Sequence, residues 1–224
     1  MPRPRKGSVR SVKRRVFIFC EGEKTEPNYI RAYIRQFHPV CARLKDAEKP
    51  VSLKGTKKNT PKQLVDEAVD FARSLDFKKD QVWVMYDRES RAKYSDDNHA
   101  QAWMRAERHG VKVALSNVCF EYWLLLHLTE TSQPANSFSD LTGRSVFKEA
   151  FRQIGFKSYE KGEANVAEAL VSEERISAAK VRAQRINKQA KSNCEPGDAE
   201  RPYRLNPYTN VYEVLEAIDD VAAE

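Results

Sequence analysis

The sequence has 224 residues, of which 41% are hydrophobic and only 8 are glycine and 10 proline, so the chain is long enough to bury a core as one domain. Charged residues make up 32%, and no apolar run approaches the ~18 residues of a membrane-spanning helix, which excludes a transmembrane protein. The formal net charge is +7, and residues 1–15 contain seven bases and no acid, so the remaining chain is balanced in charge.

Residues 1–15 are predicted to form a flexible basic tail. Such a tail suits a phosphate backbone, but it is equally typical of a solubilising terminus with no specific partner. No apolar segment with a cleavage site follows it, so a secretory signal peptide is not expected. The cysteines, Cys20, Cys41, Cys119 and Cys194, lie far apart without zinc-site spacing. We therefore expect a cytoplasmic protein with reduced, structural cysteines.

Strands and helices alternate through the first half of the sequence. Short apolar runs predict strands over 16–20, 51–53, 81–86 and 111–115, of which the second has the weakest signal. Helical spacing predicts a helix after Thr25, a second behind the Thr60-Pro61 cap, and a third that ends at Gly110. This order predicts an α/β fold: a doubly wound, mainly parallel, Rossmann-like sheet with helices on both faces.

The second half of the sequence is predicted to be helical. An apolar run over 120–128 is followed by a Ser/Thr/Pro-rich loop and by helices over 144–154, 163–191 and 210–221. We expect an α/β core over 16–128 with a helical C-terminal part, 129–224, packed on it. Five bases between Lys180 and Lys191 indicate either a solvated helix face or a surface for nucleic acid.

Carboxylates follow the first and third predicted strands. Glu21 ends the first strand with Glu23 and Glu26 close behind, and Asp87 and Glu89 follow the third. Ligand sites in open α/β sheets lie at the carboxyl ends of the strands, so these acids converge if the two strands adjoin. An extended chain would point Asp87 and Glu89 the same way. Any one of them alone could simply cap a helix or face water, but their joint placement favours a site.

Clustered carboxylates require a cation if all are to be ionised, and oxygen ligands without histidine or cysteine favour Mg²⁺ or Mn²⁺. The glycine-rich loops G-x-G-x-x-G and G-x-x-x-x-G-K-[ST] are absent from the sequence. The pattern therefore predicts metal-dependent phosphoryl transfer. Asp87 and Glu89 would anchor the metal, Glu21 would exchange a proton, and Glu26 would hold an optional second metal.

Four sequence motifs resemble those of known families. CEGEKTEPNY at 20–29 and YDRES at 86–90 resemble the glutamate and DxD motifs of topoisomerase-primase (Toprim) domains. SNVCFEYWLLLH at 116–127 is similar to the S-N-P-x-F-E-x-W-x-x-x-H block of the RloB-like family, which the chain also resembles through NPYTNVYEVLE at 206–216. The chain departs from these motifs at Val118, which replaces a proline, and at Glu89, which replaces an aspartate.

The resemblance implies a Toprim-like nuclease of bacterial antiphage defence, encoded beside restriction or abortive-infection systems. By resemblance, Glu21 is the catalytic glutamate, Asp87 and Glu89 are the metal-binding pair, and Glu26 matches a second glutamate. Glu121 and His127 belong to the signature block with Asn117 and are further candidate catalytic residues.

On physical grounds, Glu121 is a stronger candidate for a functional residue than His127. A histidine on an apolar helix is more often a satisfied interior residue than a catalyst. An acid within an apolar run must be paired, bound to metal or at a boundary, so Glu121 is the more suggestive residue. Lys54, Lys57 and Lys58, with Lys62, follow the second predicted strand and would attract phosphate, although most lysine clusters are only solvated.

Two hypotheses remain from the sequence. One is a Mg²⁺-dependent or Mn²⁺-dependent nuclease acting on DNA or RNA, tRNA included. The alternative is a catalytically degenerate module that binds nucleic acid or a partner protein, such as a toxin or a defence-system ATPase. The sequence leaves open the substrate, the trigger and whether the chain forms a homo-oligomer.

Overall fold

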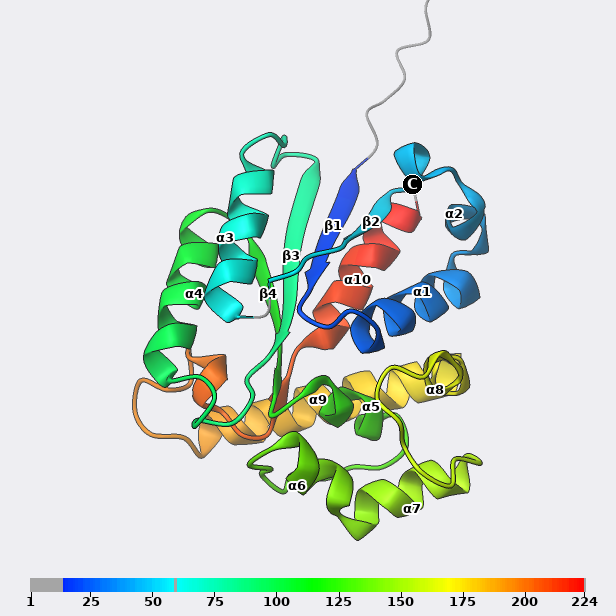
Figure 1. Cartoon of the computed structure of the whole chain (residues 1–224), viewed down its shortest axis with the longest axis vertical. Helices are drawn as coiled ribbons and strands as arrows, with labels where there is room; N and C mark the ends of the chain where they lie inside the picture. Colours follow the sequence, from blue (N-terminus) through cyan, green and yellow to red (C-terminus); the bar gives the residue numbers. More distant parts are fainter. Residues whose placement is uncertain (1–13, 59, 224) are drawn as a thin grey trace, which may run out of the picture.

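The computed structural model describes residues 14–58 and 60–223, and their strands form one sheet in the order β2-β1-β3-β4-β5 (Figure 1). The strands are β1 (Arg15–Cys20), β2 (Val51–Lys54), β3 (Asp80–Asp87), β4 (Lys112–Asn117) and β5 (Tyr208–Thr209). Strands β1 to β4 run parallel to one another, and β5 runs antiparallel to β4. The predicted α/β, Rossmann-like doubly wound fold with a mainly parallel sheet is confirmed.

The sheet is covered on both faces, which explains the uninterrupted apolar run of β1. Val16, Ile18 and Cys20 pack into one hydrophobic cluster, whereas the intervening Phe17 and Phe19 pack into the other. Successive side chains of a strand point to opposite faces, so a strand buried on both sides has no polar positions in its centre.

One face of the sheet is covered by α3 (Pro61–Ala72) and α4 (Asp96–Arg108), which lie side by side on the left of Figure 1. The Thr60 side chain accepts a hydrogen bond from the Gln63 backbone N–H at 3.4 Å, so the predicted cap is present. Ser95 caps α4 in the same way through the N–H of Asn98 at 3.3 Å.

The other face is covered by α1 (Thr25–Phe37) and by α10 (Val211–Ala222), which contacts β1, β2 and β4. Beyond the carboxyl ends of the strands lies a layer of further helices (Figure 1). These are α5 (Phe120–Leu126), α6 (Phe138–Gly143), α7 (Ser145–Gln153), α8 (Ala164–Leu170) and α9 (Glu173–Ser192). The chain also forms a short α2 (Pro39–Arg43) and the 3-10 turns η1 (Asp46–Glu48) and η2 (Pro202–Arg204).

The structure differs from the predicted elements in several places. The predicted helix over 163–191 is two helices, because the Ser172 side chain caps α9 by accepting from Arg175 N–H at 3.3 Å. The C-terminal part is not purely helical, since it adds β5 to the sheet. Strand β1 begins at Arg15, whose guanidinium pairs with Asp80 at 2.8 Å, within the segment predicted to be a tail.

Residues 1–13 of the predicted basic tail lie outside the described residues. Within the described part of the chain, no helix combines the length and the apolar character needed to cross a bilayer. All four cysteines are free thiols.

Candidate active site

The carboxyl ends of β1 and β3 bring Glu21 and Asp87 together. The two strands are direct neighbours, with Cys20 opposite Met85. The Glu21 backbone N–H donates to the Met85 carbonyl at 2.9 Å, which extends the ladder beyond the strand. The Glu21 carboxylate then accepts a hydrogen bond from the Asp87 backbone N–H at 3.1 Å. The two strand ends thus adjoin, which is the condition for their carboxylates to converge.

Three carboxylates are buried at this edge of the sheet. Asp87 ends β3, Glu26 lies in the first turn of α1 and Glu121 in the first turn of α5. Their exposed fractions are only 6%, 4% and 0%. One oxygen of Glu26 and one of Glu121 have no hydrogen-bond partner, although both are buried. Buried carboxylate oxygens without a partner are costly, so they need an explanation from function.

The other oxygens of these glutamates are held by neighbouring groups. The Gly22 backbone N–H donates to Glu26 at 3.2 Å, and the Tyr159 hydroxyl donates to Glu121 at 2.8 Å. A Cβ atom at position 22 would collide with the Glu26 carboxylate, so the glycine allows the β1–α1 turn to approach this side chain closely. The turn after β1 and the loop after α7 therefore position the buried carboxylates.

Burial and mutual repulsion make Asp87 and Glu26 harder to ionise. Burial, followed by the charges of Glu26 and Glu121, raises the pKa of Asp87 well above its ordinary value. Burial and then the charge of Glu121 likewise raise the pKa of Glu26. Lys161 opposes both shifts. Burial alone would lower the pKa of Lys161, but the charges of Glu121, Asp87 and Glu26 outweigh burial and raise it. This lysine is therefore a counter-charge to the three buried carboxylates.

Glu21 and Glu89 form a more exposed part of the site. Burial, with repulsion from Glu89 and Glu26, raises the pKa of Glu21 to about 7, although the hydrogen bond from Asp87 and the charge of Lys93 oppose this shift. The Lys93 ammonium pairs with Glu89 at 2.7 Å. A carboxyl group with a pKa near neutrality can both accept and release a proton at physiological pH.

Glu89 does not continue the extended strand that the sequence pattern suggests. Its φ is 58°, in the left-handed region that residues other than glycine rarely adopt. Its backbone N–H donates to the Val118 carbonyl at 2.9 Å, which fixes this turn against the end of β4. Asp87 is therefore buried beside Glu26 and Glu121, while Glu89 turns toward Glu21 and Lys93. A strained backbone held in this way is a recurrent feature of functional sites.

Arg88, between the two acids, is a residue that the sequence reasoning missed. Its side chain is 2% exposed and donates to the carbonyls of Tyr203 at 2.8 Å and Tyr94 at 3.0 Å, and to the Asp96 carboxylate at 2.5 Å. The guanidinium therefore ties the strand end to the C-terminal segment. No local pattern marks Arg88, because β3 ends at Asp87 and the partners of its side chain come from later segments of the chain.

Lys161 and Tyr159 were also missed, because no local pattern marks them. Both lie between α7 and α8, about forty residues beyond Glu121 in the sequence. Only the folded chain brings this loop to the carboxylates.

His127 is placed in the interior between α1 and α5. Its Nδ1–H faces the Trp123 carbonyl at 2.9 Å, which can only accept, so Nε2 is the acceptor for the Tyr29 hydroxyl at 2.9 Å. Burial lowers the pKa of His127 to about 4. Both ring nitrogens are thus engaged by interior groups and not by the carboxylates. This geometry matches the interpretation of a satisfied interior histidine, and a catalytic role for His127 stays a prediction.

The basic face predicted on α9 is partly used within the fold. Arg182 donates to the Leu126 carbonyl at 2.7 Å, and Arg185 pairs with Glu130. Lys180 lies 3.7 Å from Asp219. These contacts hold α9 against its neighbours and reduce the positive charge that it offers to a ligand.

The side chains of the site are of the chemical type that binds divalent cations. Its ligands would be carboxylate oxygens, which Mg²⁺ and Mn²⁺ prefer, and the buried oxygens of Glu26 and Glu121 that lack a hydrogen-bond partner are candidate ligands. As the side chains stand, no three histidine, cysteine or acidic residues within 14–58 and 60–223 are gathered closely enough to form a metal cage. The residues fit the ion by type and charge, but the described side chains are not gathered around one point.

Comparison with known proteins gives one match. Neither the curated proteins nor the solved structures include a match to this chain. The family model described as RloB-like protein matches residues 16–218, which contain all of the carboxylates above and the loop that carries Lys161. The chain therefore belongs to the RloB-like protein family.

Proposed function

We propose that the chain is a divalent-metal-dependent nuclease that hydrolyses phosphodiester bonds of DNA or RNA. The observation that carries this proposal is the meeting of Glu21 and Asp87 at adjoining strand ends, with the buried carboxylates of Glu26 and Glu121 around them. A set of oxygen ligands with excess negative charge is suited to Mg²⁺ or Mn²⁺, and these ions commonly complete their coordination with phosphate oxygens.

Asp87, Glu26 and Glu21 would hold the ion, with Glu89 beside Glu21. When bound, the cation would neutralise these carboxylates, polarise the scissile phosphate and lower the pKa of a water molecule. Glu21 has a pKa raised to about 7, which supports its role in accepting a proton from the nucleophile or returning one to the leaving group. Lys93 and Lys161 would bind phosphate oxygens at the two sides of the site.

We propose that the chain acts in bacterial antiphage defence, the role that its resemblance to RloB-like and Toprim motifs implies, and membership of the RloB-like family supports this proposal. We place the protein in the cytoplasm, where its four free thiols would remain reduced.

A second candidate function is favoured by Lys161. Its ammonium already acts on Asp87, Glu26 and Glu121 together, as a bound metal would. If this compensation suffices, the site is a catalytically degenerate one, and the chain binds nucleic acid or a partner protein without cleaving.

The two functions are separated by incubating the purified full chain with plasmid, single-stranded DNA and tRNA in Mg²⁺, Mn²⁺ or chelator. Glu21→Gln and Asp87→Asn are compared with Glu48→Gln, an exposed glutamate of η1 that serves as a matched control. We expect metal-dependent cleavage by the wild type and the control, reduced at least about 100-fold in the two site variants. Cleavage in chelator, or cleavage unchanged by both site variants, would refute the proposal. Retained binding without any cleavage would favour the second candidate.

A further inference from the structure

A pocket of about 670 Å³ adjoins the turn that carries Glu21, on the side of β2. We name it the β2 basic pocket. Its walls include Gly22 and Glu23 from that turn and residues 53–58, which leave the carboxyl end of β2. The parallel register, with Phe19 opposite Lys54, makes both strands end at one edge of the sheet. Because β2 and β3 flank β1 on opposite sides, Glu21 lies between this pocket and Asp87.

Bases outnumber acids in the lining of the β2 basic pocket. Its charged lining residues are Arg31, Lys54, Lys57, Lys58, Glu23 and Glu67. The Glu67 carboxylate is occupied by the Thr56 hydroxyl at 2.6 Å. The Lys54 ammonium lies 4.7 Å from the centre of the Phe71 ring, so it is held against the protein. Lys57 and Lys58 are exposed, and neither pairs with an acid among the described residues.

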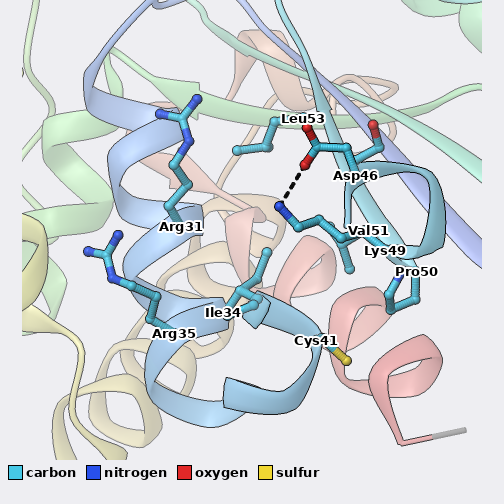
Figure 2. Close-up of a pocket in the computed structure, with 11 residues that line it drawn as sticks. Arg31, Ile34, Arg35, Cys41, Asp46, Lys49, Pro50, Val51 and Leu53 are labelled. Atoms are coloured by element: carbon cyan, nitrogen blue, oxygen red, sulfur yellow. Dashed lines mark hydrogen bonds and ion pairs between the residues drawn. The ribbon is translucent and has the colours of Figure 1, made fainter. Parts of the chain in front are cut away.

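A second pocket of about 480 Å³ between α1, α2 and β2 shares Arg31 and Leu53 with the first (Figure 2). Its other charges are already compensated. Figure 2 shows the Lys49 ammonium directed at Asp46, a pair at 2.8 Å, and Arg35 binds Glu168 at 2.9 Å. Of these two pockets, the β2 basic pocket is therefore the one with unpaired lysines, and it is also the one beside Glu21.

The lining of the β2 basic pocket also indicates which part of a nucleic acid it would contact. Among the described residues that line this pocket none is aromatic, so they offer no platform for stacking a base. Lysines attract phosphate without reading sequence. The chemistry of the pocket is thus that of a phosphate channel and not of a base-recognition pocket.

We propose that the β2 basic pocket holds the phosphodiester backbone of the substrate strand next to the bond positioned at Glu21 and Asp87. The substrate would be a polymer that extends past the carboxylates on the β2 side, bound through Lys57 and Lys58 independently of its base sequence. This inference rests on the proposed nuclease function, but binding tests it without requiring cleavage.

The test measures binding of labelled single-stranded DNA, single-stranded RNA and duplex DNA by fluorescence anisotropy, in chelator and at several salt concentrations. The Lys57→Ala/Lys58→Ala double variant is compared with Lys78→Ala/Lys79→Ala, an equal loss of charge at two exposed lysines before β3, at the opposite edge of the sheet. We expect at least about tenfold weaker binding at low salt for the pocket variant only. The slope of log K against log salt should fall by about 1.4 for single strands, or about 1.8 for duplex DNA, if two phosphate contacts are lost.

Several outcomes would overturn the proposal. Equal losses in the two double variants would show a general charge effect, and losses confined to one base sequence would show base recognition. Cleavage with unchanged binding in the pocket variant would refute the pocket and leave the nuclease function standing. If all three nucleic acids bind through the lysines but none is cleaved in any metal, the β2 basic pocket would be supported and the nuclease function would be refuted.

Discussion

Glu21 lies where the buried and the exposed carboxylates of the site meet. Its side chain receives the Asp87 N–H at 3.1 Å, and its pKa is raised by burial and by the charges of Glu89 and Glu26. Because a carboxyl group with a raised pKa binds its proton more tightly in the folded state, folding is favoured while it is protonated and opposed when it ionises. The protein therefore bears an electrostatic cost at this position above neutral pH.

This cost can be measured through the pH dependence of stability. The pKa of Glu21 rises from its ordinary 4.5 to about 7, so its stabilising contribution is complete below about pH 4.5 and is lost as the pH rises through 7. Glu21→Gln removes the titration. We expect the free energy of unfolding of the variant, relative to wild type, to increase by about 1–2 kcal/mol between pH 5.5 and 8.5. Urea denaturation without divalent metal measures this, and parallel pH profiles would contradict it.

The residues of the site differed in how readily the sequence revealed them. Asp87 and Glu21 were predictable because strand ends in a parallel sheet share one edge, a rule that needs only the order of the elements. Lys161 was not predictable, since its position depends on how the loop between α7 and α8 folds back over the sheet. The backbone turn at Glu89, with its φ of 58°, was also hidden, because the hydrogen bond that fixes it goes to the carbonyl of Val118, the residue after β4.

At the level of elements, α1 and α5 are joined by a buried hydrogen bond between Tyr29 and His127. The Tyr29 hydroxyl and His127 Nε2 are 2.9 Å apart, and both residues are almost completely buried. The first turns of these two helices carry Glu26 and Glu121. The hydrogen bond therefore stabilises the relative placement of two helices that supply buried carboxylates.

We expect Tyr29→Phe to lower the free energy of unfolding by about 1–2 kcal/mol, because the His127 acceptor would remain buried without a donor. Tyr122→Phe is the control, since it removes a comparable hydroxyl whose acceptor, the Thr131 carbonyl, belongs to a partly exposed residue. The control should lose less stability in urea denaturation. Unchanged stability of Tyr29→Phe together with lost cleavage would instead assign His127 to the chemistry.

Helices and strands with long sequence patterns were predicted more accurately than those with short patterns. Helix α3 was predicted well, since a capping threonine, a proline and a long apolar face all agree. Strand β5 has only two residues, too few for a period-two pattern, and its place beside β4 depends on a distant part of the chain. The boundary between α8 and α9 was missed because the apolar pattern continues through Val171 while Ser172 begins a new helix.

At the level of the whole molecule, the C-terminal part completes the core as well as the site. Helix α10 packs on β1, β2 and β4, and β5 extends the sheet beyond β4. The larger hydrophobic cluster combines Ile18 and Trp123 from the first half of the chain with Ile186 and Leu215 from the second. Residues 14–128 therefore lack α10, which shares with α1 the covering of one face of their sheet, and the helices that pack on α5.

We expect a fragment of residues 1–128 to show no cooperative unfolding transition and to aggregate, because it would expose the apolar surface that α9 and α10 cover. Far-UV circular dichroism in urea and gel filtration measure this, with the full chain as reference. Co-expression with residues 129–224 should restore a cooperative complex. A monomeric 1–128 fragment with a sharp transition would show that the first half folds alone.

The hydrogen bond from Arg88 to the Tyr203 carbonyl can form only late in translation, because Tyr203 is synthesised long after Arg88. All the carboxylates of the site are synthesised by residue 121, but the loop with Lys161 and the carbonyl that anchors Arg88 emerge later. A nascent chain consequently carries its acidic groups before it can arrange them. The contacts that complete the centre can therefore form only after residue 203 has been synthesised, when almost the entire polypeptide has been made.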